Sequence, residues 1–243
     1  FFEYHTIPDP ATAFAAFATD KIDLMGHGSG SPYPPQVEQT MRDFPDKKFV
    51  QNSYFGARAV GFNTVKPPFD NVDVRRAINL VMDRQAILNG WVFGKGREGA
   101  PFVPGTWMSA PDEEMWAWPG HRYVDANGDP IVNLTNHQGE MFKDPRDIAE
   151  AKALMTAAGY PDGVAQKQDH LFGRSTEEGA VFLKKDLALL GIETNDLAPE
   201  SAVFRARWRS GDFGILHVNY SLSIMDPDDI LGGIYLAQGS RNT

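Results

Sequence analysis

The chain has 243 residues, of which 42% are hydrophobic, and a net charge of −9. This length suits one large domain or two small ones, and the apolar content is enough for a buried core. The acidic balance and the lack of any run of four basic residues argue against a nucleic-acid-binding surface. The absence of cysteine excludes disulfides, thiol catalysis and zinc–thiolate sites.

We expect no signal peptide in the amino-terminal residues of this chain. The chain opens with Phe1-Phe2-Glu3-Tyr4 and lacks the basic start and apolar core of a signal peptide. No stretch approaches the ~20 apolar residues that a transmembrane helix requires. Because the chain opens directly in a strand-like run, we expect it to be a piece cut from a longer protein.

The first quarter of the chain predicts alternating strands and helices. A helix is expected at 10–19, with Asp9 as its cap and Pro10 in its first turn, and a second helix at 34–43. Strands are expected at residues 1–7, 22–25, 48–54 and 58–63. This alternation is typical of an α/β sheet.

The run from residue 61 to residue 87 predicts a strand, a stiff turn and a helix. Pro67 and Pro68 keep the turn extended, and Asp70 or Asn71 can cap the helix that follows. One apolar stripe then has helical spacing, and the helix should end near residue 90 or 94. The stripe consists of Val74, Ala77, Ile78, Val81 and Met82.

The remainder alternates between irregular and regular segments. Residues 98–143 are rich in Pro, Gly and Trp and have little periodicity, which indicates an irregular insertion with a functional role. Helices are then expected at 147–158, 176–190, 199–209 and 226–236, and strands at 168–172 and 213–220. Phe213, Ile215 and His217 should share one face of the last strand. The expected fold class is α/β, a mixed sheet flanked by helices.

No constellation of residues favours catalysis. The loop of 26–30 spaces its glycines as Gly-x-Gly-x-Gly without Gly-Lys-Ser/Thr, so a mobile loop is preferred to a phosphate cradle. No Gly-x-Ser-x-Gly elbow occurs. The segment Asp125-Ala126-Asn127-Gly128-Asp129 begins like a calcium loop, but Pro130 replaces its glycine. We therefore expect no metal, no cofactor and no enzymatic activity, and keep as the alternative a hydrolase that uses loop carboxylates and histidines.

Aromatic residues gather in the irregular segment. They are Trp107, Trp116, Trp118, His121 and Tyr123. Rings in loops often stack on sugars, peptides or heterocycles, which makes Trp116 and Trp118 candidate ligand contacts. Packing of the loop onto the domain is an equally good interpretation.

Four motifs in order resemble the family 5 extracellular solute-binding proteins. The run of 61–87 resembles the family's central signature, and Ala149–Leu154 running into Ala158–Gly163 resembles its middle helix and glycine stop. Leu189–Glu193 resembles its step from long helix to strand. The last motif combines Arg209–Phe213 with the acidic turn Asp226–Leu231. The resemblance covers nearly the whole chain.

The resemblance implies a receptor lobe. Residues 1–243 would be a single α/β lobe of the type II periplasmic-binding-protein kind, with the irregular insertion at about 98–143. Its expected partners are a small-molecule ligand, the missing second lobe and the permease of an ABC importer, and not nucleic acid. The expected location is periplasmic or extracellular, with a lipid anchor in the full-length protein as one possible form.

The resemblance also implies ligand contacts along the last strand and the helix before it. They map to Ser175, Ser201, Trp208, His217, Asn219, Tyr220, Ser221 and Ser223. Peptide receptors of the family carry an aspartate at the position of Ser223, which pairs with the peptide ammonium group. A serine cannot supply that charge, and a buried unpaired ammonium costs several kcal/mol. We therefore expect an oligosaccharide, a peptide-like compound or another polar, stackable ligand instead of a free-amine peptide.

Overall fold

The computed structural model divides the chain into two compact units, residues 1–53 and 54–243. It describes all residues except 1–2, 26–33, 49–55, 92, 95, 100–101, 103–104, 174–175, 222–225 and 233–243. The predicted glycine loop of 26–30 and nearly all of the predicted strand at 48–54 lie outside the described residues.

The first unit contains helices α1 (Pro10–Ala18) and α2 (Pro34–Asp43), both as predicted. Asp9 caps α1 by accepting a hydrogen bond from the Thr12 backbone N–H at 2.8 Å. The predicted strands at 1–7 and 22–25 are wrong for the described residues, which form no strand there. The physical reason is that no sheet covers them, since Tyr4 is 93% and Leu24 77% exposed.

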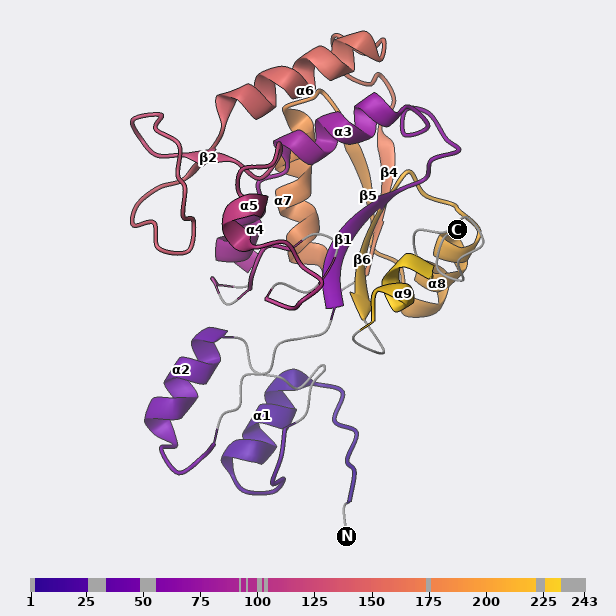
Figure 1. Cartoon of the computed structure of the whole chain (residues 1–243). Helices are drawn as coiled ribbons and strands as arrows, with labels where there is room; N and C mark the ends of the chain where they lie inside the picture. The colour runs from indigo at the N-terminus through magenta and orange to yellow at the C-terminus, as the bar shows by residue number, and fades with distance from the viewer. Residues whose placement is uncertain are drawn as a thin grey trace. The chain divides into compact units, whose positions relative to one another are not determined.

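The second unit is built on a four-stranded mixed sheet in the order β1-β6-β4-β5 (Figure 1). The strands are β1 (Gly56–Phe62), β4 (Gln168–Phe172), β5 (Thr194–Leu197) and β6 (Ile215–Ser221). Strands β4, β5 and β6 run parallel, and β1 pairs with β6 in the antiparallel direction. The predicted mixed α/β sheet is confirmed.

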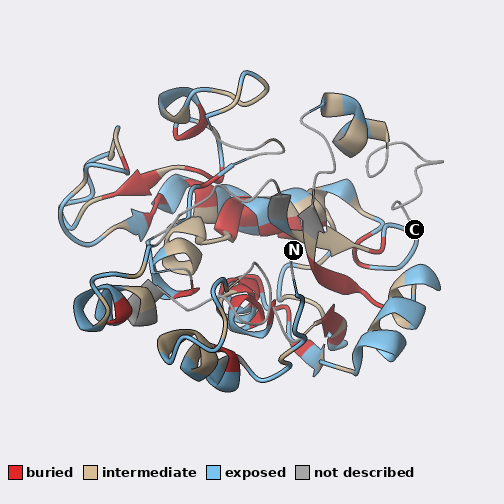
Figure 2. Cartoon of the chain, turned by 90° about the horizontal axis from the view of Figure 1, so that it is seen from below, coloured by how far each residue is buried: buried red, intermediate tan, exposed pale blue. Residues whose placement is uncertain are grey.

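Helices cover both faces of this sheet. On one side lie α3 (Val72–Val81), α4 (Arg84–Trp91), α6 (Pro145–Ala157) and α7 (Glu177–Ala188), and on the other lies α8 (Ser201–Arg209) (Figure 1). The main core joins the first group to the sheet through Ile215, Leu183 and Phe69, all fully buried. Figure 2 shows buried residues along the strands and on the inward sides of the helices. This layering matches the predicted apolar stripes.

For the helix predicted within residues 61–87, the predicted apolar stripe is correct, but the predicted end of the helix is wrong. Val74, Ala77, Ile78 and Val81 are fully buried, as predicted. The chain leaves the helix at Met82, whose ψ angle is 118°. Asp83 then accepts a hydrogen bond from the Ala86 backbone N–H at 3.0 Å and starts α4 as a separate helix.

The segment of 98–143 is largely irregular, as predicted. Its described regular elements are the short helix α5 (Asp112–Met115) and the paired strands β2 (Tyr123–Val124) and β3 (Phe142–Lys143). The segment packs around a small core of its own, formed by Met115, Trp116, Tyr123 and Leu134. The described residues of this segment therefore pack as part of the second unit.

The carboxyl-terminal part follows the predicted order, with a shorter last helix. Helix α9 (Pro227–Ile230) begins at Asp226, which accepts a hydrogen bond from the Asp228 backbone N–H at 2.9 Å. One wider helical turn follows at 231–232. The rest of the helix predicted at 226–236 lies outside the described residues.

Candidate functional site

The carboxyl ends of the parallel strands form one edge of the sheet. Strand β4 ends at Phe172, β5 at Leu197 and β6 at Ser221, and α7 and α8 begin just beyond the first two. Because β1 is antiparallel to β6, its first residues lie at the same edge, with Arg58 opposite Asn219. Ligands of open α/β sheets bind at such carboxyl edges. We call this region the carboxyl edge.

A ring cluster lies at the carboxyl edge, on the face covered by α4 and α7. His217 faces Trp91 edge-on, with ring centroids 5.8 Å apart and ring planes at 88°. The Arg58 guanidinium carbon lies 3.6 Å from the centre of the Trp91 ring, a cation–π contact. Trp91 is thus held between a buried imidazole and an exposed guanidinium.

Two glycines permit the close packing of α4 on α7. A Cβ atom at Gly179 would lie 2.3 Å from Cζ3 of Trp91 and 2.8 Å from Cε1 of His217. A Cβ atom at Gly90 would lie 2.3 Å from Cζ of Phe182. A real Cβ atom tolerates neither distance. Glycine at positions 90 and 179 therefore allows Trp91 to pack against His217.

Beneath Trp91, two histidines stack within the sheet. The rings of His170 and His217 are 6.0 Å apart and nearly parallel, at 18°. Burial lowers the pKa of His170 to about 4, although Asp196, whose Oδ1 lies 3.4 Å from Nδ1, acts to raise it. Burial, followed by the charges of His170 and Arg58, lowers the pKa of His217 to about 3. Both rings are therefore neutral near pH 7.

The residues predicted from the last strand are only partly brought together. Asn219 is half-buried at the carboxyl edge, and Ser201 is exposed at the start of α8. His217 is only 4% exposed, so it supports Trp91 from below and presents little surface to a ligand. Tyr220 and Ser221 belong to β6, but their side chains lie outside the described part, as do Ser175 and Ser223 entirely.

Trp208 lies on the opposite face of the sheet from His217. It packs against a cluster of Leu171, Phe213, Leu216 and Val218 beneath α8. The prediction that Phe213 shares a face with Ile215 and His217 is wrong, because β6 begins only at Ile215 and Phe213 packs with the even-numbered residues. The strict alternation of side chains applies only within the strand.

The tryptophans of the irregular segment differ in their surroundings. Trp116 is buried in the small core of the segment, at 7% exposure, where packing accounts for it. Trp118 is half-buried and faces His121 edge-on, with ring centroids 6.0 Å apart. Trp107 is 76% exposed. The structure therefore supports the packing interpretation for Trp116.

A buried polar network fastens the irregular segment to the helices. Asp147, at 0% exposure, accepts hydrogen bonds from the backbone N–H of Gly120 at 2.9 Å and from Nε of Arg122 at 3.0 Å. The Lys143 ammonium donates to the Gly120 carbonyl at 2.6 Å. Burial lowers the pKa of Lys143 to about 8. In the fold, these groups thus serve as hydrogen-bond partners for one another.

The same network continues to α4 and α7. The Tyr123 hydroxyl donates to Oδ1 of Asp83 at 3.0 Å, and Asp186 accepts from the Asp83 backbone N–H at 2.8 Å. Burial raises the pKa of Tyr123, and it raises the pKa of Asp186 to about 6. His121 Nδ1 lies 2.7 Å from Oε1 of the buried Glu98. The loop carboxylates and histidine that a hydrolase would need are thus used in structural contacts.

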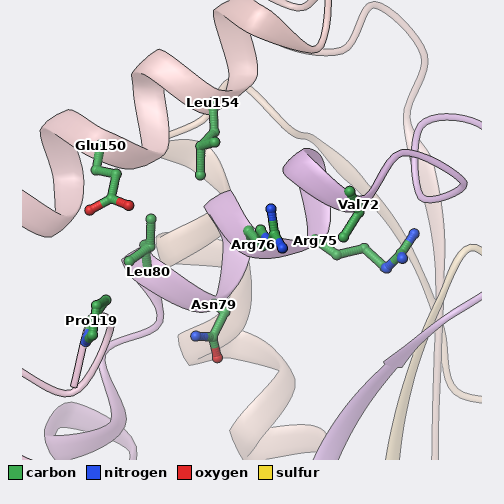
Figure 3. Close-up of a pocket in the computed structure, with 8 residues that line it drawn as sticks. All are labelled: Val72, Arg75, Arg76, Asn79, Leu80, Pro119, Glu150 and Leu154. Carbon is green, nitrogen blue, oxygen red and sulfur yellow. The ribbon is translucent and has the colours of Figure 1, made fainter.

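A shallow groove of about 510 Å³ lies elsewhere, between α3 and α6 (Figure 3). Figure 3 shows the lining residues Arg75, Arg76 and Asn79 on α3, with Glu150 and Leu154 on α6 above. Arg75 is engaged by the backbone carbonyls of Phe69 and Asp70, at 2.6 and 3.1 Å. None of the residues predicted as ligand contacts lines this groove.

Two general properties of the described residues bear on function. They contain no group of three or more histidine and carboxylate side chains arranged to hold a metal ion. No helix in the described part of the chain has the length and apolar character needed to span a membrane.

Comparison with known proteins decides the family. The model of the bacterial extracellular solute-binding proteins, family 5, middle part, matches residues 2–242. The chain belongs to this family. The resemblance expected from the four short motifs is thereby confirmed.

The relatives and solved structures of family 5 that match are binding proteins. Heme-binding protein A of Haemophilus influenzae is 26% identical over 97% of this chain and 38% of its own length. Di/tripeptide-binding protein 1 of Pseudomonas aeruginosa is 23% identical over 84% of this chain and 34% of its own length. The periplasmic binding protein DppA of Helicobacter pylori, in complex with the peptide STSA, has a TM-score of 0.65 at 26% identity. It is matched over 93% of this chain and 38% of that protein.

These comparisons confirm the fold class, and they agree with the expectation of no enzymatic activity, since the relatives described above are named as binding proteins. The chain spans between a third and two fifths of the length of the curated relatives described above. The hydrolase alternative finds no support among them.

Sequence reasoning missed Arg58 and Trp91. A signal for Arg58 was present, since Arg58, Val60 and Phe62 alternate along the strand and an arginine on that side is out of place in a core. Trp91 follows Gly90 at the end of α4. Only the packing of α4 on α7 shows that the two side chains meet.

Proposed function

We propose that this chain is the ligand-binding lobe of a bilobal receptor that captures a small solute for an ABC importer. In this proposal residues 1–243 form one lobe, residues 98–143 are its irregular insertion, and the ligand lies against the carboxyl edge. A second lobe closes over the ligand by a hinge movement. The receptor then delivers the ligand to the permease without chemical change.

The observation that carries this proposal is the convergence at the carboxyl edge. Three independent strand ends, β4, β5 and β6, terminate there, and the exposed Ser201 and the half-buried Asn219 occupy that edge. Arg58 and Trp91 add a cation and an aromatic ring from two further elements. Such a mixture of apolar rings and a few polar groups is typical of small-molecule sites.

The remaining expected partners and the location follow from the family. A solved relative is described as an ABC transporter-associated periplasmic binding protein, which supports a periplasmic or extracellular location and a permease partner. A lipid anchor in the complete protein would keep the receptor at the membrane. The exposed Tyr4 and Leu24 of the first unit offer apolar surface that the second lobe would cover.

The ligand proposed here is peptide-like or tetrapyrrolic, with its amine blocked or absent. Relatives are named for heme, for di- and tripeptides and for glutathione. Ser223 provides no carboxylate for a ligand ammonium group, which disfavours free-amine peptides. The sequence also suggested an oligosaccharide, but none of these relatives is named for one. An oligosaccharide is therefore included in the test as the competing ligand.

The test is calorimetric titration of the complete protein that contains this chain. The panel consists of Ala-Ala-Ala, its N-acetyl form, glutathione, hemin and maltotriose. We expect N-acetyl-Ala-Ala-Ala or hemin, which carry no free amine, to bind with a Kd of about 1 μM or tighter, equivalent to roughly −8 kcal/mol. Acetylation of the tripeptide should not weaken its binding.

A matched pair of variants checks the location of the site. Asn219→Ala at the carboxyl edge should weaken binding at least about tenfold, which corresponds to ~1.4 kcal/mol. Asn195→Ala is the control, because Asn195 lies at the opposite end of β5 and is exposed. Equal effects of the two variants, or tight binding of maltotriose alone, would contradict the proposal.

A further inference from the structure

Two asparagine–glycine steps occur in the chain, and the structure holds them in different ways. Asn89-Gly90 lies within α4, whereas Asn127-Gly128 lies in the turn between β2 and Pro130. An asparagine followed by glycine is chemically unstable, because the missing side chain leaves the glycine nitrogen free to attack the asparagine side-chain carbonyl. Both asparagines are exposed to solvent. The backbone around each of them therefore decides whether this reaction takes place.

The turn that contains Asn127 has room to move. A hydrogen bond of 3.0 Å from the Gly128 backbone N–H to the Asp125 carbonyl closes it as a β-turn. A Cβ atom at Gly128 would meet no other described residue within 4 Å, and residues 126–130 are all exposed. The side-chain Nδ2 of Asn127 lies 3.5 Å from Oδ2 of Asp125, at the long limit of a hydrogen bond. Such a turn opens locally at little cost in free energy, so its asparagine can reach the geometry of the reaction.

The helix that contains Asn89 lacks this freedom. A helical side chain tilts toward the amino terminus of its helix, so the side chain of Asn89 is directed away from the Gly90 nitrogen. A Cβ atom at Gly90 would lie 2.3 Å from Cζ of Phe182, so the backbone here is closely packed. The next residue, Trp91, is 6% exposed and packs edge-on against His217. Asn89 can therefore reach the geometry of the reaction only when this end of α4 unpacks.

We propose that Asn127 is a site of spontaneous modification, at which the exposed turn converts the asparagine to aspartate and isoaspartate. The Gly128 nitrogen attacks Cγ of Asn127, the new N–Cγ bond replaces the bond between Cγ and Nδ2, and ammonia leaves with the proton of the glycine amide. Water then opens the five-membered succinimide ring. Opening at Cγ gives aspartate, and opening at the backbone carbonyl carbon of Asn127 gives isoaspartate. The reaction requires only water and does not depend on the proposed function.

The products change both the charge and the backbone of the turn. Each product carries a carboxylate at position 127, between Asp125 and Asp129. The isoaspartyl form also inserts one methylene group into the main chain of a loop whose ends are joined by a hydrogen bond of 2.9 Å, from the Asp125 N–H to the Asp129 carbonyl. The modified loop between β2 and Pro130 is therefore more acidic, and in the isoaspartyl form its main chain is also longer.

The experiment follows both asparagines in one sample. The complete protein that contains this chain is incubated near neutral pH at physiological temperature, and aliquots taken over several weeks are digested and analysed by mass spectrometry. The mass of each peptide shows how much of its amide has become an acid. We expect Asn127 to convert at least about tenfold faster than Asn89, because each rate follows the population of the locally opened backbone. An isoaspartyl methyltransferase with S-adenosylmethionine then identifies the isoaspartyl product.

Two controls assign the difference in rate to the fold. In concentrated guanidinium chloride, which unfolds the chain, the two asparagines should convert at similar rates, because each is followed by glycine. Asn127→Gln should abolish conversion at position 127, since the longer side chain would have to form a less favourable six-membered ring. The same variant should leave the rate at Asn89 unchanged, and circular dichroism checks that it folds.

Three outcomes would overturn the assignment of Asn127. The first is an absence of conversion at position 127 in the folded protein. The second is a rate at Asn89 that equals or exceeds the rate at Asn127. The third is a difference that persists unchanged in guanidinium chloride, because the neighbouring sequence and not the fold would then be its cause. None of these outcomes bears on ligand binding, which the calorimetric titration tests separately.

Discussion

Trp91 meets the buried edge of His217 at 88°, and the contact joins the end of α4 to the middle of β6. The two residues are 126 positions apart in the chain. The contact couples the signature segment to the strand that carries the predicted ligand contacts. Several measurable properties of the protein depend on it.

Replacement of Trp91 should destabilise the fold. Trp91→Ala removes a side chain that is only 6% exposed and leaves a cavity next to His217 and Gly179. We expect a loss of about 3–5 kcal/mol in the free energy of unfolding, measured by urea denaturation. Trp107→Ala is the matched control, because Trp107 is 76% exposed, and it should change stability by less than about 0.5 kcal/mol. Similar losses for both would contradict the packing described here.

A larger residue at position 179 should force Trp91 and His217 apart. Gly179→Ala places a Cβ atom 2.3 Å from Trp91, and the strain should exceed the gain in helix propensity of about 1 kcal/mol. We expect a net loss of about 1–3 kcal/mol by urea denaturation. Gly173→Ala, with no atom within 4 Å of its Cβ, should be neutral or slightly stabilising. A stable Gly179→Ala protein would show that the helices pack less closely than the structure indicates.

The stacked histidines should make the fold sensitive to acid. The pKa of His170 is lowered to about 4 and that of His217 to about 3, below the value of 6.5 in an unfolded chain. As the pH falls, the unfolded state therefore binds protons before the folded state does. The contribution of the two neutral histidines to the free energy of unfolding is present above pH 6.5 and is lost as the pH falls toward 3.

The measurement is the pH dependence of the unfolding free energy. His217→Asn should reduce its slope between pH 6.5 and 4 by about 1 kcal/mol per pH unit. His137→Gln, a change in the irregular segment, should leave the slope unchanged. An unaltered slope in His217→Asn would refute the assignment of a buried neutral ring.

Asp186 should have the opposite effect on the pH dependence of stability, so its contribution to the free energy of unfolding should fall as the pH rises. Burial raises its pKa to about 6, above the ordinary aspartate value of 3.8 in an unfolded chain. The contribution of Asp186 to the free energy of unfolding is present below pH 3.8 and is lost as the pH rises through 6, because the folded state holds the proton more tightly. Asp186→Asn should abolish this loss, which amounts to up to about 3 kcal/mol. The exposed Asp162→Asn serves as the control, and parallel pH curves for wild type and Asp186→Asn would count against the assignment.

Much of the fold was predictable because local rules decide it. The stripe Val74, Ala77, Ile78 and Val81 is buried as its spacing predicts, and α7 buries Ala180, Leu183 and Leu187 in the same way. Glycine stops, proline turns and aspartate caps act within a few residues and can be read directly. The strands at 1–7 and 22–25 were predicted wrongly, because a strand needs neighbours that the sequence pattern cannot supply.

The candidate site was less predictable than the fold. The resemblance directed attention to β6 and to the starts of α7 and α8, which the topology gathers at one edge. It placed Trp208 and His217 together, whereas they pack on opposite faces of the sheet. It did not indicate Arg58, whose meaning depends on the tryptophan beneath it.

The amino-acid sequence alone determined the family, the α/β class and most helices, because these depend on residue spacing, capping and turn chemistry within short windows. The tertiary structure alone decided that Arg58, Trp91, Gly179 and His217 form one cluster. These residues come from four separate elements, and their contacts arise only when the sheet register and the packing of α4 on α7 are fixed.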